Sequence, residues 1–248
     1  MIVVEAAVDT LRSALAAERA GVDRLELCAS LYDGGTTPSA GLIACVLERV
    51  RVPVLLMVRP RGGHFAYSDD EFAVMKRDIE LARGSGVAGF VSGILGPDNR
   101  IDLERTRVLV DTAGSLPVTF HRAFDLVDDQ GDATESLIDA GVVRVLTSGG
   151  AASALEGAVR IAELVDHTDG RIRVMAGGGI REHNVRDVIS RTGVSEVHTG
   201  LSFLAGAGRW AHAPGVRIRK PLPADEAAWS EVDEERMRRL VEVVRSGS

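Results

Sequence analysis

Central to this chain is the stretch Thr119-Phe120-His121-Arg122-Ala123-Phe124-Asp125, which reads as a short strand that runs into a polar loop. In an alternating strand, Thr119 and His121 point to one side and Phe120 to the other, where it suits packing under a helix. His121, Arg122 and Asp125 then place a base, a fixed cation and a carboxylate at the end of the strand. The stretch therefore predicts a buried strand with a functional end.

The same unit, an apolar strand with a polar end and a helix behind it, repeats along the chain at intervals of about 30 residues. Eight strands are predicted to start near residues 2, 23, 53, 89, 117, 142, 172 and 194. Strict alternation of strands and helices implies a parallel sheet, and eight units in 248 residues are the size of a (β/α)₈ barrel. An open doubly wound sheet is the competing architecture, but it needs a topological switch point and usually fewer strands.

Helix signals occupy the segments between the predicted strands. Ser68 and Glu71 form a capping box, and glycines close several of the helices. Helices are expected over residues 11–20, 39–50, 68–83, 102–113, 132–140, 153–165, 182–191 and 224–245. The chain is thus predicted to be one α/β domain over residues 1–248, a TIM-like (β/α)₈ barrel with a C-terminal helical extension. The barrel core is expected over about 1–205, and the tail with its helix over about 206–248.

Composition and charge exclude several classes of protein. With 45% hydrophobic residues the chain can bury a large core, and its net charge of −7 argues against binding to nucleic acid. Two cysteines do not make a disulfide scaffold, and the N-terminus lacks the pattern of a signal peptide. No window reaches the roughly 18 apolar residues of a membrane span. A cytoplasmic protein without membrane association is therefore expected.

Polar residues gather at the predicted carboxyl ends of the strands, the face that carries the active site in barrel enzymes. Because strands one, two, three and eight are neighbours in a closed barrel, Glu5, Glu26, Arg59 and His198 are predicted to form one patch. His121 and Arg122 are then expected on the opposite side of the barrel mouth, which is the opening formed by the carboxyl ends of the strands. Alternatively, Glu5, Glu26 and Arg59 neutralise one another as a structural network, since buried charges need partners.

One chemical interpretation of this set is proton transfer. Glu26 or His121 would act as the base and Arg59 and Arg122 as clamps for an anion. The full set of candidate catalytic residues is Glu26, Arg59, His121, Arg122, Asp125 and His198. A Schiff-base mechanism is excluded, because both lysines fall outside the strand ends, Lys76 in a helix and Lys220 in the tail. No nucleotide cofactor is indicated.

A second interpretation is anion or phosphate binding at the ends of strands seven and eight. The expected binding residues there are Gly177, Gly178, Gly179, Thr199 and Gly200. Glycines let backbone N–H groups face an anion, and the N-terminus of the following helix adds positive potential. The alternative is that the glycines only permit tight turns.

Metal binding is a third interpretation. Cys28 lies near the mouth on strand two, whereas Cys45 falls in a helix, so the two thiols cannot share an ion in one barrel. The alternative is that each cysteine is a small buried residue. Harder metals would use Glu5, Glu26, His121 and His198, although no spacing motif demands it.

Several long strings of residues resemble the CutC family, in order and over most of residues 1–200. They are Asp23-Arg24-Leu25-Glu26-Leu27-Cys28, Gly34-Gly35-Thr36-Thr37-Pro38-Ser39, Arg59-Pro60-Arg61-Gly62-Gly63-His64-Phe65-Ala66-Tyr67-Ser68, the opening stretch, Val145-Leu146-Thr147-Ser148-Gly149 and Glu196-Val197-His198. The resemblance implies a cytoplasmic TIM-like barrel, often a homo-oligomer, in a family named for copper homeostasis.

By this resemblance the protein would bind copper, as Cu(I), with Cys28 as its ligand. Some family members carry cysteines just after the first strand, where this chain has Ala6 and Ala7. Two hypotheses therefore stand side by side: a copper homeostasis protein, and a barrel enzyme or sensor for a small anionic or phosphorylated ligand. A barrel that acts only through its surface is the third, and the polar mouth argues against it.

Overall fold

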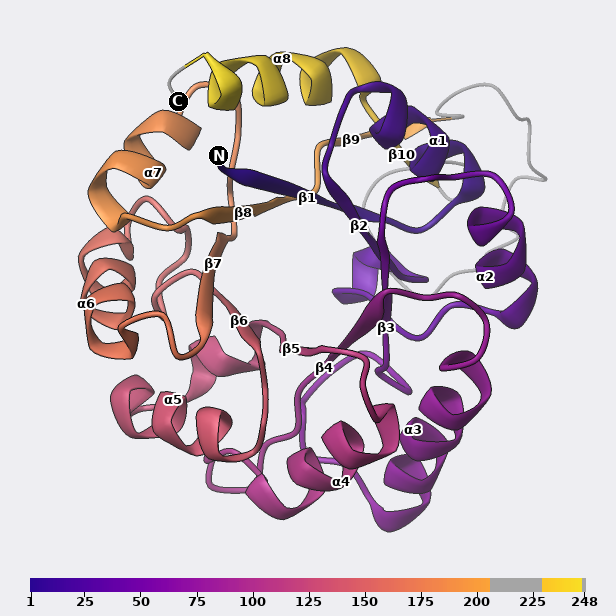
Figure 1. Ribbon diagram of the computed structural model, residues 1–248, viewed down its shortest axis with the longest axis vertical. Coiled ribbons are helices and arrows are strands. Elements are labelled where there is room, and N and C mark those ends of the chain that lie inside the picture. The colour runs from indigo at the N-terminus through magenta and orange to yellow at the C-terminus, as the bar shows by residue number, and fades with distance from the viewer. Residues whose placement is uncertain (206–228, 247–248) are drawn as a thin grey trace, which may run out of the picture.

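A computed structural model of the chain, which describes residues 1–205 and 229–246, shows a closed barrel of eight parallel strands in sequential order (Figure 1). The strands are β1 (Val3–Val8), β2 (Arg24–Leu27), β3 (Val54–Met57), β4 (Gly89–Ser92), β5 (Val118–Phe120), β6 (Arg144–Thr147), β7 (Arg173–Gly177) and β8 (Glu196–Thr199). Each starts within two residues of its predicted position. The predicted (β/α)₈ barrel is confirmed.

Helices pack around the outside of the barrel and follow the strands in sequence (Figure 1). They are α1 (Leu11–Arg19), α2 (Ala40–Leu47), α3 (Asp69–Ala82), α4 (Leu103–Ala113), α5 (Gln130–Asp139), α6 (Ala158–Thr168), α7 (Val185–Thr192) and α8 (Glu234–Arg245). The capping box at the start of α3 is present, with the Ser68 hydroxyl accepting from the Glu71 amide and the Glu71 carboxylate accepting from the Ser68 amide.

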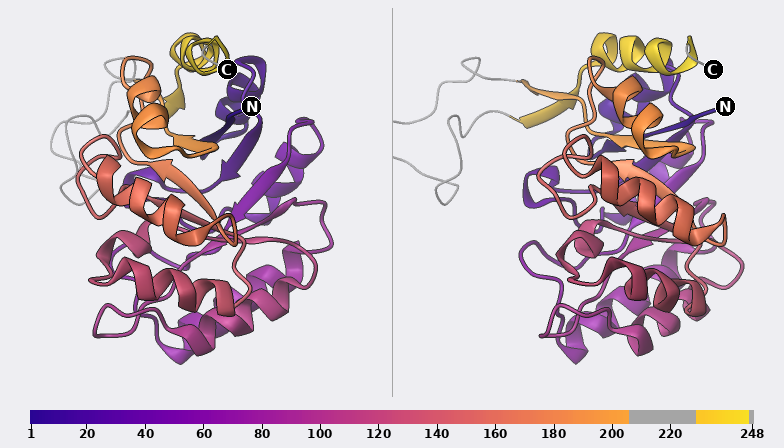
Figure 2. Two further views of the ribbon diagram at one scale, coloured as in Figure 1. Left: turned by 60° about the vertical axis from the view of Figure 1, so that its left-hand side comes forward. Right: turned by 90° about the vertical axis from the view of Figure 1, so that its left-hand side faces the viewer.

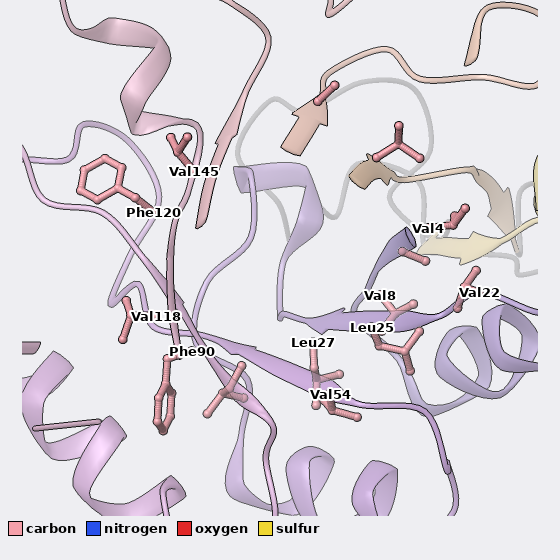
Figure 3. Close-up of a cluster of buried hydrophobic side chains, with 14 of the residues drawn as sticks. Val4, Val8, Val22, Leu25, Leu27, Val54, Phe90, Val118, Phe120 and Val145 are labelled. Carbon is pink, nitrogen blue, oxygen red and sulfur yellow. The ribbon is translucent and has the colours of Figure 1, made fainter. Parts of the chain in front are cut away.

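Alternation along the strands divides the buried residues into two sets. On β1, Val4, Ala6 and Val8 belong to the main apolar core between the barrel and its helices, together with Leu25 of β2 and Phe90 of β4 (Figure 3). The residues between them point into the barrel, because successive side chains on a strand face opposite sides. A smaller apolar cluster, made of Cys28, Leu55, Met57 and Val91, lies apart from the main core.

The C-terminal part differs from the prediction. The sequence predicts a helix through residues 229–245, but β10 (Trp229–Val232) is a strand that pairs antiparallel with β9 (Ser202–Ala205). Only α8 is helical, and it begins at Glu234 with Asp233 as its N-cap. The two strands project from one side of the barrel in Figure 2. Trp229 and the β-branched Val232 have a high propensity for strands, and here β9 provides a strand with which they pair.

Two further boundaries differ from the sequence prediction. The predicted helix at 153–165 begins only at Ala158, because residues 151–157 form turns that carry the chain back from the end of β6. The predicted helix at 182–191 begins at Val185. Residues 206–228, including the predicted start of the last helix at 224, lie outside the described residues. Within the described part of the chain, no helix is long and apolar enough to cross a membrane.

Candidate metal centre at the barrel mouth

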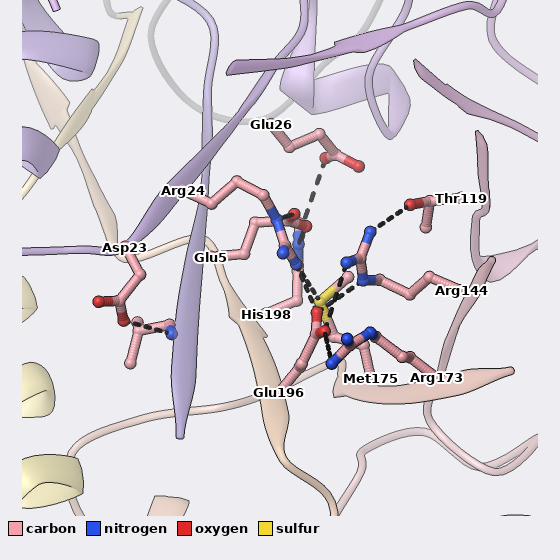
Figure 4. Close-up of polar contacts among 11 residues, drawn as sticks. Glu5, Asp23, Arg24, Glu26, Thr119, Arg144, Arg173, Met175, Glu196 and His198 are labelled. Atoms are coloured by element: carbon pink, nitrogen blue, oxygen red, sulfur yellow. Dashed lines mark hydrogen bonds and ion pairs between the residues drawn. The ribbon is translucent and has the colours of Figure 1, made fainter. Parts of the chain in front are cut away.

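Glu5 and His198 occupy neighbouring strands inside the barrel. Their Cα atoms are register partners in the β1–β8 pairing, and Nδ1 of His198 lies 2.8 Å from Oε1 of Glu5 (Figure 4). Burial alone would lower the pKa of His198, but the nearby carboxylates of Glu26 and Glu5 outweigh it and raise this pKa. Burial would raise the pKa of Glu5, yet His198 and Arg24 lower it to about 2. Glu5 is therefore an ionised carboxylate that orients the imidazole.

The other ring nitrogen of His198 faces a second carboxylate. Nε2 lies 3.8 Å from Oε2 of Glu26, and the thiol of Cys28 donates to the same oxygen over 3.5 Å. Oε1 of Glu26 is buried and has no hydrogen-bond partner among the described residues. Burial raises the pKa of Glu26, and it also raises the pKa of the Cys28 thiol, to which the Glu26 charge adds. Oε2 of Glu26 thus lies next to both an imidazole nitrogen and a thiol.

Ligand atoms of Glu5, Glu26 and His198 lie within 4.8 Å of one another, close enough to share a metal ion. The two oxygens of Glu5 are already engaged, however, with His198 and with Arg24, whose Nε donates to Oε2 over 2.5 Å. A carboxylate that holds the far nitrogen of a histidine is the usual outer partner of a metal site. His198, Glu26 and Cys28 carry the donor atoms next to this carboxylate, and we call these three residues the mouth cluster.

An ion network lies next to this cluster inside the barrel (Figure 4). The Glu196 carboxylate accepts from Arg24 and from Arg144, each at 2.6 Å, and the Arg144 guanidinium also donates to the Thr119 hydroxyl. Burial would raise the pKa of Glu196, but the two guanidinium groups lower it. The network joins β2, β5, β6 and β8 across the barrel. Its Arg24 guanidinium, together with His198, keeps Glu5 ionised.

Arg59 does not join the carboxylate patch, contrary to the prediction from the sequence. Its terminal N–H groups donate to the backbone carbonyls of Asp33, Gly35 and Gly63, at 2.7, 2.8 and 2.8 Å. The side chain of Arg24 takes the place next to Glu5 instead. Arg24, Glu26 and Cys28 alternate on one face of β2, and that alternation was visible in the sequence. The pairing of Arg24 with Glu5 was not, because it depends on the register between β1 and β2.

Both carboxylate oxygens of Asp125 are engaged in hydrogen bonds, and its predicted catalytic role stays a prediction. It accepts hydrogen bonds from the Thr147 hydroxyl at 2.5 Å, from the Ser148 amide and hydroxyl, and from the Gly150 amide. It also accepts a hydrogen bond from Nε of Arg122 at 2.7 Å. The short 3₁₀ helix from Arg122 to Leu126 brings the carboxylate into the loop after β6. The Asp125 carboxylate thus accepts the hydrogen bonds of that loop, and its ion pair with Arg122 holds the Arg122 side chain in position.

The predicted anion site at the ends of β7 and β8 is built differently from expectation. Gly178 and Gly179 have positive φ angles of 97° and 72°, so both glycines are needed for the turn itself. A Cβ at Gly177 would lie 2.5 Å from Cδ1 of Leu146, which is a packing requirement. The Thr199 hydroxyl donates to the Ile180 carbonyl at 3.0 Å. Anion binding by these residues and Gly200 stays a prediction.

His121 directly follows β5 and is buried. Its Nδ1 accepts a hydrogen bond from the Ala123 amide at 3.2 Å, and its Nε2 is buried with no partner among the described residues. Burial lowers the pKa of His121 to about 3, and the Arg59 guanidinium adds to this effect. The ring is therefore neutral at physiological pH, and it does not contact the mouth cluster through any hydrogen bond.

Sequence reasoning missed the roles of Arg144 and Glu196. Arg144 lies within a short predicted strand that is otherwise apolar, and Glu196 lies within one that is bounded by valines. A charged residue within each of two buried strands indicates an ion pair in the protein interior, and the sequence contained this indication. Cys45 lies exposed on α2, so it is neither a buried packing residue nor a neighbour of Cys28.

Comparisons with known proteins agree on one family. The model of the CutC family matches residues 2–203. The human copper homeostasis protein cutC homolog is 42% identical over 98% of this chain and 89% of its own length. A family protein CutC of Xylella fastidiosa is 42% identical over 99% of this chain and 90% of its own. These relatives confirm the resemblance that the sequence motifs indicated.

Solved structures agree with the fold. The crystal structure of CutC from Streptococcus agalactiae superposes with a TM-score of 0.76 and 35% identity, covering 80% of this chain and 98% of that one. A phosphoribosylanthranilate isomerase from Thermotoga maritima superposes with a TM-score of 0.59 at 14% identity, covering 99% of this chain and 100% of that one. The second likeness shows the barrel fold alone.

Proposed function

This chain belongs to the CutC family, and from the geometry of its mouth cluster we propose that it binds one copper ion. The ligands would be the Cys28 thiolate, Nε2 of His198 and the Glu26 carboxylate. One observation carries the proposal: Oε2 of Glu26 lies within 3.8 Å of both other donor atoms, while its Oε1 has no partner among the described residues. The names of the relatives, which refer to copper homeostasis, support the choice of metal.

The donor set fits copper. A thiolate is the soft ligand that favours Cu(I), and imidazole is also a copper ligand. Glu5 would hold Nδ1 of His198 and so present Nε2 to the ion. Because the Cys28 thiol is protonated at neutral pH, binding would release its proton. Glu26 would supply a third donor and balance part of the charge of the ion.

Anaerobic competition between the protein and a strong Cu(I) chelator tests the proposal. We expect the wild-type chain to bind one copper, and Cys28→Ser and His198→Gln to lose that binding. Cys45→Ser is the matched control, because it removes the exposed thiol on α2 and leaves the mouth unchanged. Far-UV circular dichroism checks that every variant is folded. Binding that survives in Cys28→Ser, or that disappears in Cys45→Ser, would contradict the assignment.

Acid–base chemistry on a small anionic ligand is the second candidate. The observation in its favour is that Glu26 has a raised pKa and an oxygen without a partner among the described residues, as a general acid or base requires. His121 is neutral, and its free Nε2–H would donate a hydrogen bond to the ligand. Arg122 would contribute the positive charge near Gly178, since a Cβ there would lie 3.2 Å from its Cζ. Failure of the wild-type chain to compete for copper would favour this candidate. Assembly into a homodimer or larger homo-oligomer stays a prediction.

A further inference from the structure

Three buried polar atoms without a hydrogen-bond partner among the described residues belong to Arg59 and to two residues near it, since the Arg59 charge acts on both Tyr67 and His121. They are Nε of Arg59, the hydroxyl of Tyr67 and Nε2 of His121, and the three residues are 4%, 6% and 5% exposed. Cζ of Arg59 lies 4.8 Å from the centre of the Phe65 ring, and the His121 ring centre lies 4.9 Å from it. None of these residues belongs to the mouth cluster. A native structure rarely leaves so many buried polar atoms unsatisfied in one place.

All three atoms can donate a hydrogen bond. The guanidinium Nε always carries a hydrogen. His121 is neutral, and its Nδ1 accepts from the Ala123 amide, so the ring hydrogen is on Nε2. The Tyr67 hydroxyl lies close enough to the Arg59 guanidinium for its pKa to be affected, although no well-aligned hydrogen bond joins the two. Its hydrogen is therefore free to point elsewhere.

Arg59 is also a buried cation without a counter-charge. Three of its four terminal N–H groups donate to backbone carbonyls, and no carboxylate within the described ranges forms an ion pair with it. Arg24 and Arg144, the other inward-pointing guanidinium groups, both pair with Glu196. An unpaired buried charge is strongly unfavourable unless something compensates it. The missing component is an anion.

The backbone holds Arg59 rigidly in this position. Its amide donates to the Thr37 hydroxyl at 3.0 Å, and its carbonyl accepts from the Thr37 amide at 2.9 Å. Phe65 is fixed in turn, because its carbonyl accepts from the Leu95 amide. Donors that are positioned before the ligand arrives lose little entropy on binding. The guanidinium of Arg59, held next to Phe65, is therefore preorganised for an acceptor.

We propose that Arg59, Tyr67 and His121 form a binding subsite for the oxyanion group, a carboxylate or a phosphate, of a small molecule. The guanidinium supplies the charge, and the hydroxyl and imidazole supply two further hydrogen bonds. The subsite lies at the ends of β3 and β5, so it differs from the anion site that the glycines of β7 and β8 predict. It does not depend on copper binding.

The two tyrosines of the chain, Tyr32 and Tyr67, make the subsite observable. In a Tyr32→Phe background, Tyr67 is the only tyrosine, and its ring gives a single signal in the NMR spectrum of tyrosine-labelled protein. Tyr32 is 46% exposed, so its replacement is the matched control for folding. Sodium phosphate and sodium acetate are titrated separately against sodium chloride at constant ionic strength. We expect a saturable shift of the Tyr67 signal with at least one of the two oxyanions and none with chloride.

Variants decide where the oxyanion binds, with affinity measured by calorimetry. Arg59→Met should abolish binding, and Tyr67→Phe should weaken it about tenfold, because each removes a donor to a charged acceptor. Tyr67→Phe deletes one unpartnered hydroxyl and so keeps the test valid if Arg59→Met fails to fold. A response to phosphate alone, or to acetate alone, identifies the class of ligand. The proposal is overturned if neither oxyanion binds, or if Gly178→Ala abolishes binding while Tyr67→Phe preserves it.

Discussion

At the scale of single residues, the function of each charged side chain depends on which of its atoms are already engaged. Glu5 and Glu26 are both buried carboxylates at the mouth, yet both oxygens of Glu5 have partners and one oxygen of Glu26 has none among the described residues. The first is therefore an orienting group, and the second is a potential ligand or acid. Asp125 and Arg59 differ in the same way, since Asp125 is saturated and Arg59 lacks a counter-charge within the described ranges.

The neutral state of His121 predicts a specific loss of stability in acid. Its pKa is 6.5 in an unfolded chain and about 3 in the fold, so the unfolded state binds the proton first as the pH falls. The contribution of His121 is fully present above pH 6.5 and is lost progressively between pH 6.5 and about 3. Between pH 6.5 and 5 the free energy of unfolding of the wild-type chain should fall by about 2 kcal/mol more than that of His121→Asn. The shorter amide side chain of that variant does not titrate, and its oxygen can still accept a hydrogen bond from the backbone.

Urea unfolding at a series of pH values, in chloride buffer without phosphate or carboxylates, measures this difference. Carboxylates that also titrate in acid contribute equally to both chains and cancel. Parallel pH profiles for the two chains would show that His121 is not held neutral by burial, and the assignment of Nε2 as a donor would fail with it.

At the scale of elements, the barrel is joined across its interior by ion pairs as well as by its strands. Glu196 at the start of β8 holds both Arg24 of β2 and Arg144 of β6. Register alone does not bring β2 and β6 together, because each pairs only with its own neighbours. The network therefore decides which charges compensate one another inside the barrel, and it sets the charge environment of Glu5.

Replacing Glu196 with glutamine should destabilise the fold strongly. The change leaves the shape intact but removes the negative charge shared by two buried guanidinium groups, which typically costs about 3–5 kcal/mol. Glu80→Gln is the control, because Glu80 pairs with Arg77 on the exposed surface of α3 and such a pair is worth about 1 kcal/mol or less. Urea unfolding measures the loss of stability in both variants. Equal, small losses in the two variants would mean that the interior network contributes no more than a surface ion pair.

At the scale of the whole molecule, the ring of helices is completed by a segment far along the chain. β8 pairs with β1 to close the barrel, but the helix that covers this seam is α8, which lies between α7 and α1 (Figure 1). Met237, Leu240, Val241 and Val244 are buried on its inner face. That the whole chain folds as one domain stays a prediction, and α8 is the element that makes it physically reasonable.

Leu240→Ala should therefore destabilise the whole barrel and not only its last helix. Leu240 is fully buried, and truncating such a leucine costs about 2–5 kcal/mol. Arg238→Ala, on the exposed side of the same helix, should change stability by about 0.5 kcal/mol or less. Thermal unfolding should show one transition that moves down in Leu240→Ala. A separate early transition, with the main one unchanged, would mean that α8 unfolds independently.

Local patterns in the sequence determined the number, order and type of the barrel elements. Strand alternation and helix caps act over a few neighbouring residues, and they identified eight strands, the capping box of Ser68 and Glu71, and the shared face of Arg24, Glu26 and Cys28. Strict alternation of strand and helix then left the closed parallel barrel as the favoured fold. The motifs that indicated the CutC family belong to the same local level.

Only the tertiary structure decided which charged groups meet. Glu5 contacts Arg24 and not Arg59 because the register between neighbouring strands, and not spacing along the chain, sets those distances. Asp125 is saturated because a 3₁₀ helix carries it to the loop after β6. The strand at 229–232 forms because β9 offers it a partner. Each of these outcomes rests on contacts between distant segments, which local propensity does not encode.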